Sequence, residues 1–213
     1  MRITKLEHAT FLLEKDGAKL VIDPGGFTRP LPDLSAVAAV VITHEHGDHW
    51  DAPHLQAIVD ANPGVPIYGP HGVKDAATGF DVTAVGAGDT VTAGPFELSF
   101  FGGTHSIIHS SIPAVDNLGV SVDGGAVYYP GDSFAVPEGV EVDVLAAPSS
   151  APWLKIGEAI DFVLAVKPRR AFPTHEMINS ELGQHMAKDR IGWAAQQNGG
   201  ELLDLSAGGS AEL

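Results

Sequence analysis

The chain of 213 residues is 44% hydrophobic and 18% charged, a balance typical of a globular protein with a sizeable core. Its formal net charge of -15 at pH 7 argues against nucleic-acid binding, because such a surface repels phosphate backbones. The absence of cysteine excludes disulfides, thiol nucleophiles and thiolate ligands, so any metal must be held by His, Asp or Glu.

The N-terminal segment 1–15 does not have the shape of a signal peptide, since Lys5 and Glu7 interrupt its apolar residues. No stretch of the sequence approaches the ~20 apolar residues that a bilayer span needs. We therefore expect a cytoplasmic protein that does not bind membranes.

Runs of β-branched and apolar residues between turn signals predict a series of strands. Most of these runs are short and are separated by Gly, Pro or Asp, which is typical of a loop-rich β fold. The strands are expected at Ile3–Leu6, Thr10–Glu14, Lys19–Asp23, Val37–Thr43, Pro66–Tyr68, Phe96–Phe101, Leu118–Val122, Ala126–Tyr129, Val142–Ala146, Ala171–Pro173 and Glu201–Leu205.

Helical patterns occupy three segments between these strands. The segment Ala52–Ala61 follows Asp51, a residue type that favours the N-cap position. The segment Ile156–Val166 repeats apolar residues on one helical face. The segment Glu181–Gln197 runs into Asn-Gly-Gly, residue types that favour the end of a helix.

The order of the elements predicts two β-sheets packed face to face with helices on the outside. Neither an internal repeat of short period nor a linker interrupts the sequence. We therefore expect a single domain over residues 1–213.

The central motif is an apolar strand that ends abruptly in potential metal ligands, His44, His46, Asp48 and His49. In extended backbone, residues two apart point the same way, so His44 and His46 can contact one ion. A turn at Gly47 allows Asp48 and His49 to face a second position. Imidazole and carboxylate without sulfur suit Zn²⁺, Mn²⁺ or Fe.

Other predicted strands also end in ligand-type residues. A sandwich that brings these strand ends to one rim would collect ligands from distant parts of the chain, on rigid supports. The strand-end residues are Asp23, His105, Asp132 and His175.

The motif at residues 44–49, followed in order by His105, Asp132 and His175, resembles the metal-ligand set of the metallo-β-lactamase superfamily. The opening residues 8–13, followed by Asp23, are similar to the branch that contains the UlaG-type lactonases. The resemblance implies an α+β fold, a four-layer αββα sandwich with two divalent metal ions at one edge of the sheets.

The resemblance also implies which side chains hold each ion, with zinc the first expectation and manganese or iron the alternatives. One ion would be bound by His44, His46 and His105. The other would be bound by Asp48, His49 and His175, with Asp132 bridging the two.

The chemistry of such a pair follows from general principles. Two cations about 3.5–4 Å apart can share a water and lower its pKa toward ~7, which yields a metal-bridged hydroxide at neutral pH. Asp48 can accept a hydrogen bond from that water and orient it. His8 and Asp23 are expected to support the ligands, because a ligating imidazole commonly donates its other N–H to a carboxylate. Asp48, His8 and Asp23 are therefore the catalytic candidates.

Several other residues leave alternatives open. His109 rivals His105 as a ligand, but the Gly-Gly-Thr before His105 favours a strand-end ligand there, and His109 is then free to contact substrate. Ser133 lacks a visible His–Asp pairing, which disfavours a serine nucleophile. Trp153 can either wall a substrate pocket, together with Ser149 and Ser150, or pack in the core. Structural or surface positions are expected for His54, His71 (on a Pro-Gly turn) and His185.

The sequence thus predicts a binuclear metal-dependent hydrolase that acts on a small molecule with an ester, lactone or amide bond. The alternatives are a phosphodiesterase that acts on a phosphorylated small molecule and a non-catalytic metal-binding protein of the same fold. The expected partner is a small-molecule substrate rather than nucleic acid or membrane, and a homo-oligomer is left open.

Overall fold

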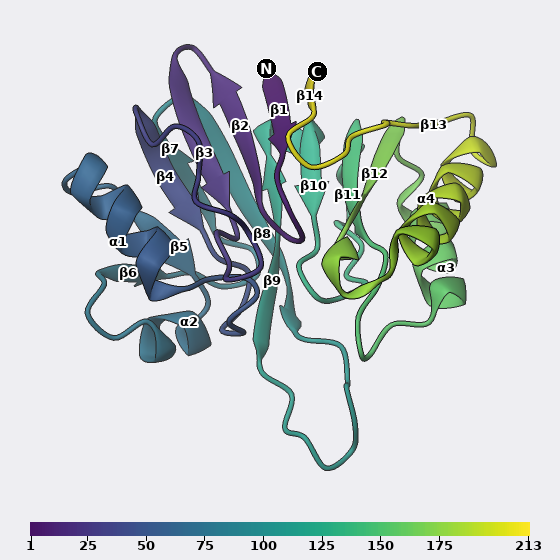
Figure 1. Ribbon diagram of the computed structural model, residues 1–213, viewed down its shortest axis with the longest axis horizontal. Coiled ribbons are helices and arrows are strands. Elements are labelled where there is room, and N and C mark those ends of the chain that lie inside the picture. Colours follow the sequence, from purple (N-terminus) through teal and green to yellow (C-terminus); the bar gives the residue numbers. More distant parts are fainter.

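The computed structural model describes all residues 1–213, and two seven-stranded sheets form its centre (Figure 1). The first sheet has the strand order β14-β1-β2-β3-β4-β5-β6, and the second has the order β13-β12-β11-β10-β9-β8-β7. The strands of the first sheet are β1 (Arg2–Lys5), β2 (Phe11–Lys15), β3 (Ala18–Ile22), β4 (Val37–Val41), β5 (Ile67–Gly69), β6 (Val82–Ala84) and β14 (Ser210–Glu212). Those of the second sheet are β7 (Thr90–Ala93), β8 (Phe96–Thr104), β9 (Asp116–Val122), β10 (Val127–Tyr129), β11 (Val144–Pro148), β12 (Arg170–Thr174) and β13 (Glu201–Leu202).

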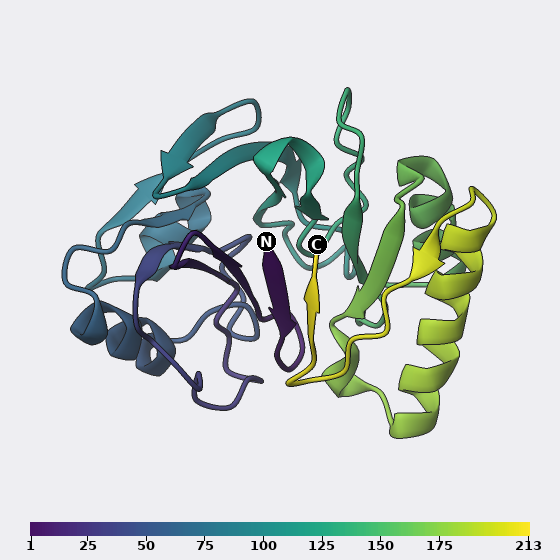
Figure 2. The same cartoon turned by 90° about the horizontal axis from the view of Figure 1, so that it is seen from above.

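Helices cover the outer face of each sheet. Figure 2 shows the sheets face to face, with one helical layer beyond each of them. The layer on the first sheet consists of α1 (Ala52–Ala61) and α2 (His71–Ala76), and that on the second of α3 (Ile156–Val166) and α4 (Glu181–Gln196). Two short 3₁₀ turns complete the structure, η1 (Asp123–Gly125) and η2 (Glu176–Ile178). This four-layer αββα arrangement confirms the predicted fold class.

The apolar core consists of three layers that match this architecture. The largest cluster lies between the sheets and includes Phe11 and Leu20 from the first sheet and Phe96 and Phe172 from the second. A second cluster packs the first sheet against α1 and α2, and a third packs the second sheet against α3 and α4. Because both faces of the central strands are buried, strands such as β4 are almost continuously apolar.

The longer helices begin and end close to their predicted limits, because their signals are local. Asp51 caps α1 by accepting a hydrogen bond from the His54 backbone N–H at 2.8 Å.

The sequence analysis missed α2, β6, β7 and β14, which are short and carry little apolar periodicity. The assignment of His71 to a turn was wrong, because this residue begins α2 after Pro70.

The ends of several strands meet at one rim of the sandwich, the lower edge of the sheets in Figure 1. A bridge between His44 and Asn117 joins the two sheets there, and the Leu118 N–H donates to the Thr43 carbonyl at 2.9 Å. No helix of this chain has the length and apolar character that a bilayer span requires.

A buried arginine, Arg170, is paired with a carboxylate at the end of the second sheet that lies away from the rim. The guanidinium of Arg170 lies 2.6 Å from Asp143 Oδ2, and Arg169 Nε lies 2.5 Å from Asp143 Oδ1. Hydrogen bonds from Arg169 and Arg170 hold the pKa of Asp143 below its ordinary value of 3.8. These two arginines are therefore committed to one carboxylate and do not form an open basic patch.

We expect Asp143→Asn to lower the free energy of unfolding by about 1–2 kcal/mol at pH 7, because Arg170 loses its charged partner. A depressed carboxyl pKa stabilises the folded state above the ordinary pKa and loses that effect as the pH falls through the folded pKa. The difference from wild type should therefore shrink below about pH 4. Urea denaturation at several pH values measures this, with Glu141→Gln as a neighbouring exposed control. An equal loss in both variants would contradict the prediction.

Candidate metal centre

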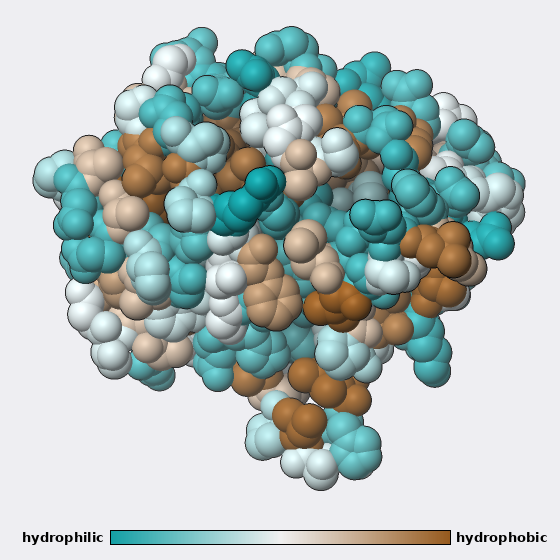
Figure 3. All heavy atoms as spheres, viewed as in Figure 1, coloured by the Kyte–Doolittle hydropathy of each residue, from teal (hydrophilic) through white to brown (hydrophobic).

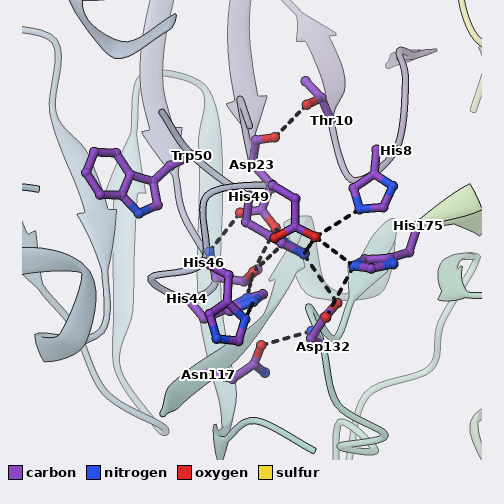
Figure 4. Close-up of polar contacts among 12 residues, drawn as sticks. His8, Thr10, Asp23, His44, His46, His49, Trp50, Asn117, Asp132 and His175 are labelled. Carbon is purple, nitrogen blue, oxygen red and sulfur yellow. Dashed lines mark hydrogen bonds and ion pairs between the residues drawn. The ribbon is translucent and has the colours of Figure 1, made fainter. Parts of the chain in front are cut away.

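The motif after β4 and the residue after β8 form a first group of ligand-type side chains, and Figure 4 shows the two motif residues His44 and His46 side by side. The ligand atoms of His44, His46 and His105 all lie within 4.8 Å of one another. His44 Nε2 is 3.0 Å from His46 Nδ1. These three imidazoles can therefore contact a single ion.

A second group lies beside the first and combines both sheets. The ligand atoms of His8, Asp48, His49 and His175 lie within 4.8 Å of one another. Asp48 Oδ2 is 3.2 Å from His175 Nε2 and 4.0 Å from His49 Nε2. Asp48 and His49 come from the loop of the motif, whereas His175 follows β12.

The carboxylate of Asp132 lies between the two groups. Its Oδ2 is 3.4 Å from His105 Nε2 in the first group and 3.3 Å from His175 Nε2 in the second. Its Oδ1 is 3.3 Å from His49 Nε2. The Asp132 carboxylate therefore faces imidazoles of both groups.

Asp23 and Thr43 orient two of the imidazoles. His49 Nδ1 donates to Asp23 Oδ2 at 2.6 Å, so its Nε2 faces the centre. His44 Nδ1 lies 3.1 Å from Thr43 Oγ1, and that hydroxyl donates to Asp23 Oδ2 at 2.7 Å. Because the outer nitrogens carry the protons, the inner nitrogens present lone pairs.

A backbone carbonyl orients the third imidazole. His105 Nδ1 donates to the Ser106 carbonyl at 2.5 Å, which again leaves Nε2 facing the centre. Burial, which is complete for His44, lowers the pKa of that ring well below 6.5 and favours its neutral form. Neutral rings with inward lone pairs are the form in which histidine binds metals.

Buried atoms without partners test whether this centre fits metal ions. Nε2 of His49, His105 and His175 and Oδ1 of Asp132 are all buried and lack a hydrogen-bond partner. Unpaired buried polar atoms are rare, because each forfeits its solvation without compensation. Imidazole nitrogens and a carboxylate oxygen that converge in this way fit the coordination of divalent metal.

Comparison with known proteins identifies the family of this chain. A family model described as Beta-lactamase superfamily domain matches residues 2–175. The chain belongs to the beta-lactamase superfamily. The match does not distinguish branches, so membership of the UlaG-like branch stays a prediction.

Relatives of this superfamily member are found in bacteria and archaea. Protein Rv0786c of Mycobacterium tuberculosis is 36% identical over 84% of this chain and 85% of its own length. A UPF0173 protein of Pyrococcus furiosus is 31% identical over 85% of this chain and 86% of its own. A protein of Thermococcus kodakarensis that bears the name UPF0173 metal-dependent hydrolase is 27% identical over 82% of this chain and 84% of its own.

Solved structures share the fold. Igni18, a metallo hydrolase from Ignicoccus hospitalis, superimposes with a TM-score of 0.76 at 20% identity, covering 99% of this chain and 97% of its own. YhfI from Bacillus subtilis, a metallo-beta-lactamase fold protein, has a TM-score of 0.71 at 17% identity, covering 99% of this chain and 98% of its own.

His8 supports the second group in this superfamily member. The Met177 backbone N–H points at His8 Nδ1 at 3.4 Å, and His8 Nε2 lies 3.1 Å from Asp48 Oδ2. With Nδ1 as the acceptor, the Nε2–H donates to the Asp48 carboxylate. The ring of His8 also packs on His175, with centroids 3.9 Å apart.

A buried ion pair that the sequence analysis missed fixes the backbone below these rings. Lys5 Nζ donates to the Leu6 and His8 carbonyls at 2.7 and 3.0 Å and pairs with Glu176 at 2.9 Å. Glu176 also accepts the His8 N–H at 3.0 Å. The ion pair therefore joins the β1–β2 loop to the residue that follows His175.

Two glycines permit the close packing of the ligand loops. Gly131 has a left-handed φ of 62°, and a Cβ there would lie 2.5 Å from Asn117 Oδ1. That same oxygen accepts the Asp132 N–H at 2.9 Å, so Asn117 positions the Asp132 backbone, a role that the sequence did not reveal. At the second glycine, Gly25, a Cβ would overlap the backbone carbonyl of Asp48.

The remaining candidates lie outside the two groups. The His109 ring is exposed and contacts Ser111 Oγ at 2.7 Å. Of the two ligand candidates His105 and His109, the structure therefore brings only His105 into the first group. Ser133 Oγ donates to the Pro130 carbonyl at 3.0 Å. On the helices, His54 pairs with its N-cap residue Asp51, and His185 lies exposed on α4.

Trp153 contacts the centre directly, and the sequence left its role open. The indole Nε1–H donates to Asp132 Oδ2 at 2.9 Å, and the ring packs on Phe134 with centroids 5.2 Å apart. This indole N–H is the one side-chain donor that is hydrogen-bonded to the Asp132 carboxylate. It therefore holds the carboxylate that faces both groups.

We expect Trp153→Phe to weaken metal binding about tenfold, because removal of a hydrogen bond to a ligand commonly costs 10–100-fold in affinity. Competition against a chromogenic chelator measures the dissociation constants. Trp193→Phe, on the exposed face of α4, is the matched control and should bind like wild type. Equal affinities for Trp153→Phe and Trp193→Phe would show that the indole hydrogen bond has no such role.

Proposed function

We propose that this superfamily member is a metal-dependent hydrolase with a two-metal centre that acts on an ester, lactone or amide bond in a small molecule. The observation that carries the proposal is the position of Asp132, whose carboxylate faces both ligand groups within 3.4 Å. Relatives that bear the name metal-dependent hydrolase support the same general activity.

Most residues of the centre would serve as metal ligands. Two divalent cations, with zinc favoured and manganese or iron as alternatives, supply a Lewis acid and a water of lowered pKa when bound. His44, His46 and His105 would hold one ion, and Asp48, His49 and His175 the other, with Asp132 shared. A protein that needed only the fold would have no physical use for the second group.

Asp48 is the residue best placed to handle a proton. Its side chain is 23% exposed, whereas those of His8 and His49 are fully buried, so it lies where a water can approach. The carboxylate can accept a hydrogen bond from the attacking water and orient it. His8 donates to the same carboxylate and limits its rotation, and Asp23 fixes the neighbouring imidazoles.

Charge favours a small substrate over a polyanion. The net charge of -15 opposes the approach of nucleic acid, and Arg169 and Arg170 are already paired with Asp143. The similarity of residues 8–13 and Asp23 to the UlaG-type branch supports a lactone or a related cyclic ester. Bound metal ions attract phosphate, so the alternative substrate to test against lactones and esters is a phosphorylated small molecule.

We expect two equivalents of metal per chain after reconstitution with Zn²⁺ or Mn²⁺ and removal of excess. His46→Ala should bind fewer equivalents, because it removes one ligand from the first group. Elemental analysis by mass spectrometry measures the ratio. His109→Ala, whose imidazole lies outside both groups, should retain two. One ion or none in fully loaded wild-type protein would overturn the two-metal proposal.

We expect kcat/KM to be higher for lactones or esters than for phosphodiesters at matched metal loading. Asp48→Ala should lower kcat for the best of these substrates by about 10²-fold or more, as loss of a positioned acid–base group does. Steady-state kinetics with a panel of all three classes measures both effects. Phosphodiester cleavage orders of magnitude faster than any lactone or ester would replace the carbonyl substrate with a phosphodiester. Absence of turnover in the two-metal form would favour a non-catalytic protein.

A further inference from the structure

A cleft of about 500 Å³ lies between the β8–β9 loop and the segment that leads into α3. This volume falls within the range of small-molecule sites, roughly 300–1,000 Å³. Five of its nine lining residues are hydrophobic, and these five come from three separate parts of the chain. The apolar walls are formed by Ile107, Ile108, Phe134, Trp153 and Leu154.

Two residues of the cleft contact the candidate metal centre. Trp153 lines the cleft and donates its indole N–H to Asp132 at 2.9 Å. Ser106 also lines the cleft, follows the ligand His105 directly, and donates its backbone N–H to the Asp132 carbonyl at 2.9 Å. The cleft therefore shares Trp153 with the hydrogen bonds that hold Asp132.

The charged residues of the cleft do not provide a free charge. Lys155 and Glu158 line it, and Lys155 Nζ lies 3.6 Å from Glu158 Oε1. Both side chains are largely exposed, at 84% and 49%, so they lie at the mouth. The hydrophobic part of the cleft, beside a Lys155–Glu158 pair whose charges offset each other, is suited to an uncharged apolar group.

One wall residue is exposed to an unusual degree for its type. The side chain of Ile107 is 71% exposed, on the loop that projects below the sheets in Figure 1. Figure 3 shows apolar side chains gathered on this loop and on the adjoining surface. Exposed apolar patches of this kind commonly mark binding sites.

We propose that this cleft binds an uncharged apolar arm of the substrate, an alkyl chain or an aromatic ring, while the scissile bond lies at the metal centre. This inference rests on the proposed hydrolase function for the identity of the ligand as substrate. It narrows the substrate class to esters, lactones or amides that carry an apolar substituent.

Binding of neutral alcohols tests the cleft without any turnover. Titration of metal-loaded protein with 1-octanol and 1-butanol, followed by tryptophan fluorescence, should give at least tenfold tighter binding of 1-octanol, because each buried methylene contributes up to about fourfold. Ile107→Asp should weaken 1-octanol binding at least fivefold. Ile112→Asp, on the same loop but outside the cleft, is the matched control and should bind like wild type.

Turnover of p-nitrophenyl butyrate and p-nitrophenyl octanoate tests the link to the reaction. Wild-type protein and Ile112→Asp should prefer the octanoate in kcat/KM, and Ile107→Asp should lose that preference. If neither ester is hydrolysed but 1-octanol binding still depends on Ile107, the cleft stands as an apolar site and the hydrolase proposal fails. If 1-octanol binding is the same in Ile107→Asp and Ile112→Asp, the cleft proposal is overturned whatever the turnover.

Discussion

The buried carboxylate of Asp23 sets the orientation of imidazoles in both ligand groups. It accepts hydrogen bonds from the Thr43 N–H at 2.8 Å, the Thr43 hydroxyl at 2.7 Å and His49 Nδ1 at 2.6 Å. Through the Thr43 hydroxyl it also reaches His44, so one side chain at the end of β3 governs rings that face two different positions. A buried charge persists only when it is well hydrogen-bonded, and these donors meet that requirement. The loop after β4 therefore has little freedom to turn its ligands away from the rim.

Backbone strain gathers around the same centre. His8, Asp23 and His175 all have left-handed φ angles, 58°, 45° and 63°, which residues with a Cβ adopt at a cost. Such conformations persist when the surrounding structure over-determines them, and they cluster at functional sites. Here the Lys5–Glu176 ion pair supplies that constraint for His8 and His175, because it joins their loops through hydrogen bonds to backbone atoms. The Lys5–Glu176 ion pair does not touch the ligand atoms, but it fixes the backbone that carries His8 and His175.

The sequence predicted what depends on neighbouring residues and missed what depends on distant ones. The limits of α1 and the polar residues at strand ends are local patterns, and His44 and His175 were found from them. Trp153 donates to a residue 21 positions away, and Lys5 pairs with one 171 positions away. Neither separation leaves a periodic signal, so the sequence left the role of Trp153 open between a pocket wall and the core and gave no sign of the role of Lys5. The strand β14 was not predicted for the same reason, because its partner β1 lies at the other end of the sequence (Figure 2).

The core between the sheets controls the distance across which the ligands meet. Phe11 of the first sheet packs edge-on against Tyr129 and Phe172 of the second, with centroids 5.5 and 5.9 Å apart. Tyr129 ends β10 three residues before Asp132, and Phe172 lies three residues before His175. Close-packed aromatic rings resist small displacements, so this contact transmits the sheet separation directly to the ligands of the second sheet. The first sheet supplies its four ligands from one short loop, whereas the second supplies three from separate strands. The geometry of the centre therefore depends on how the two sheets pack, and a change in the core at Phe11 would displace Asp132 and His175 relative to the motif without touching any ligand.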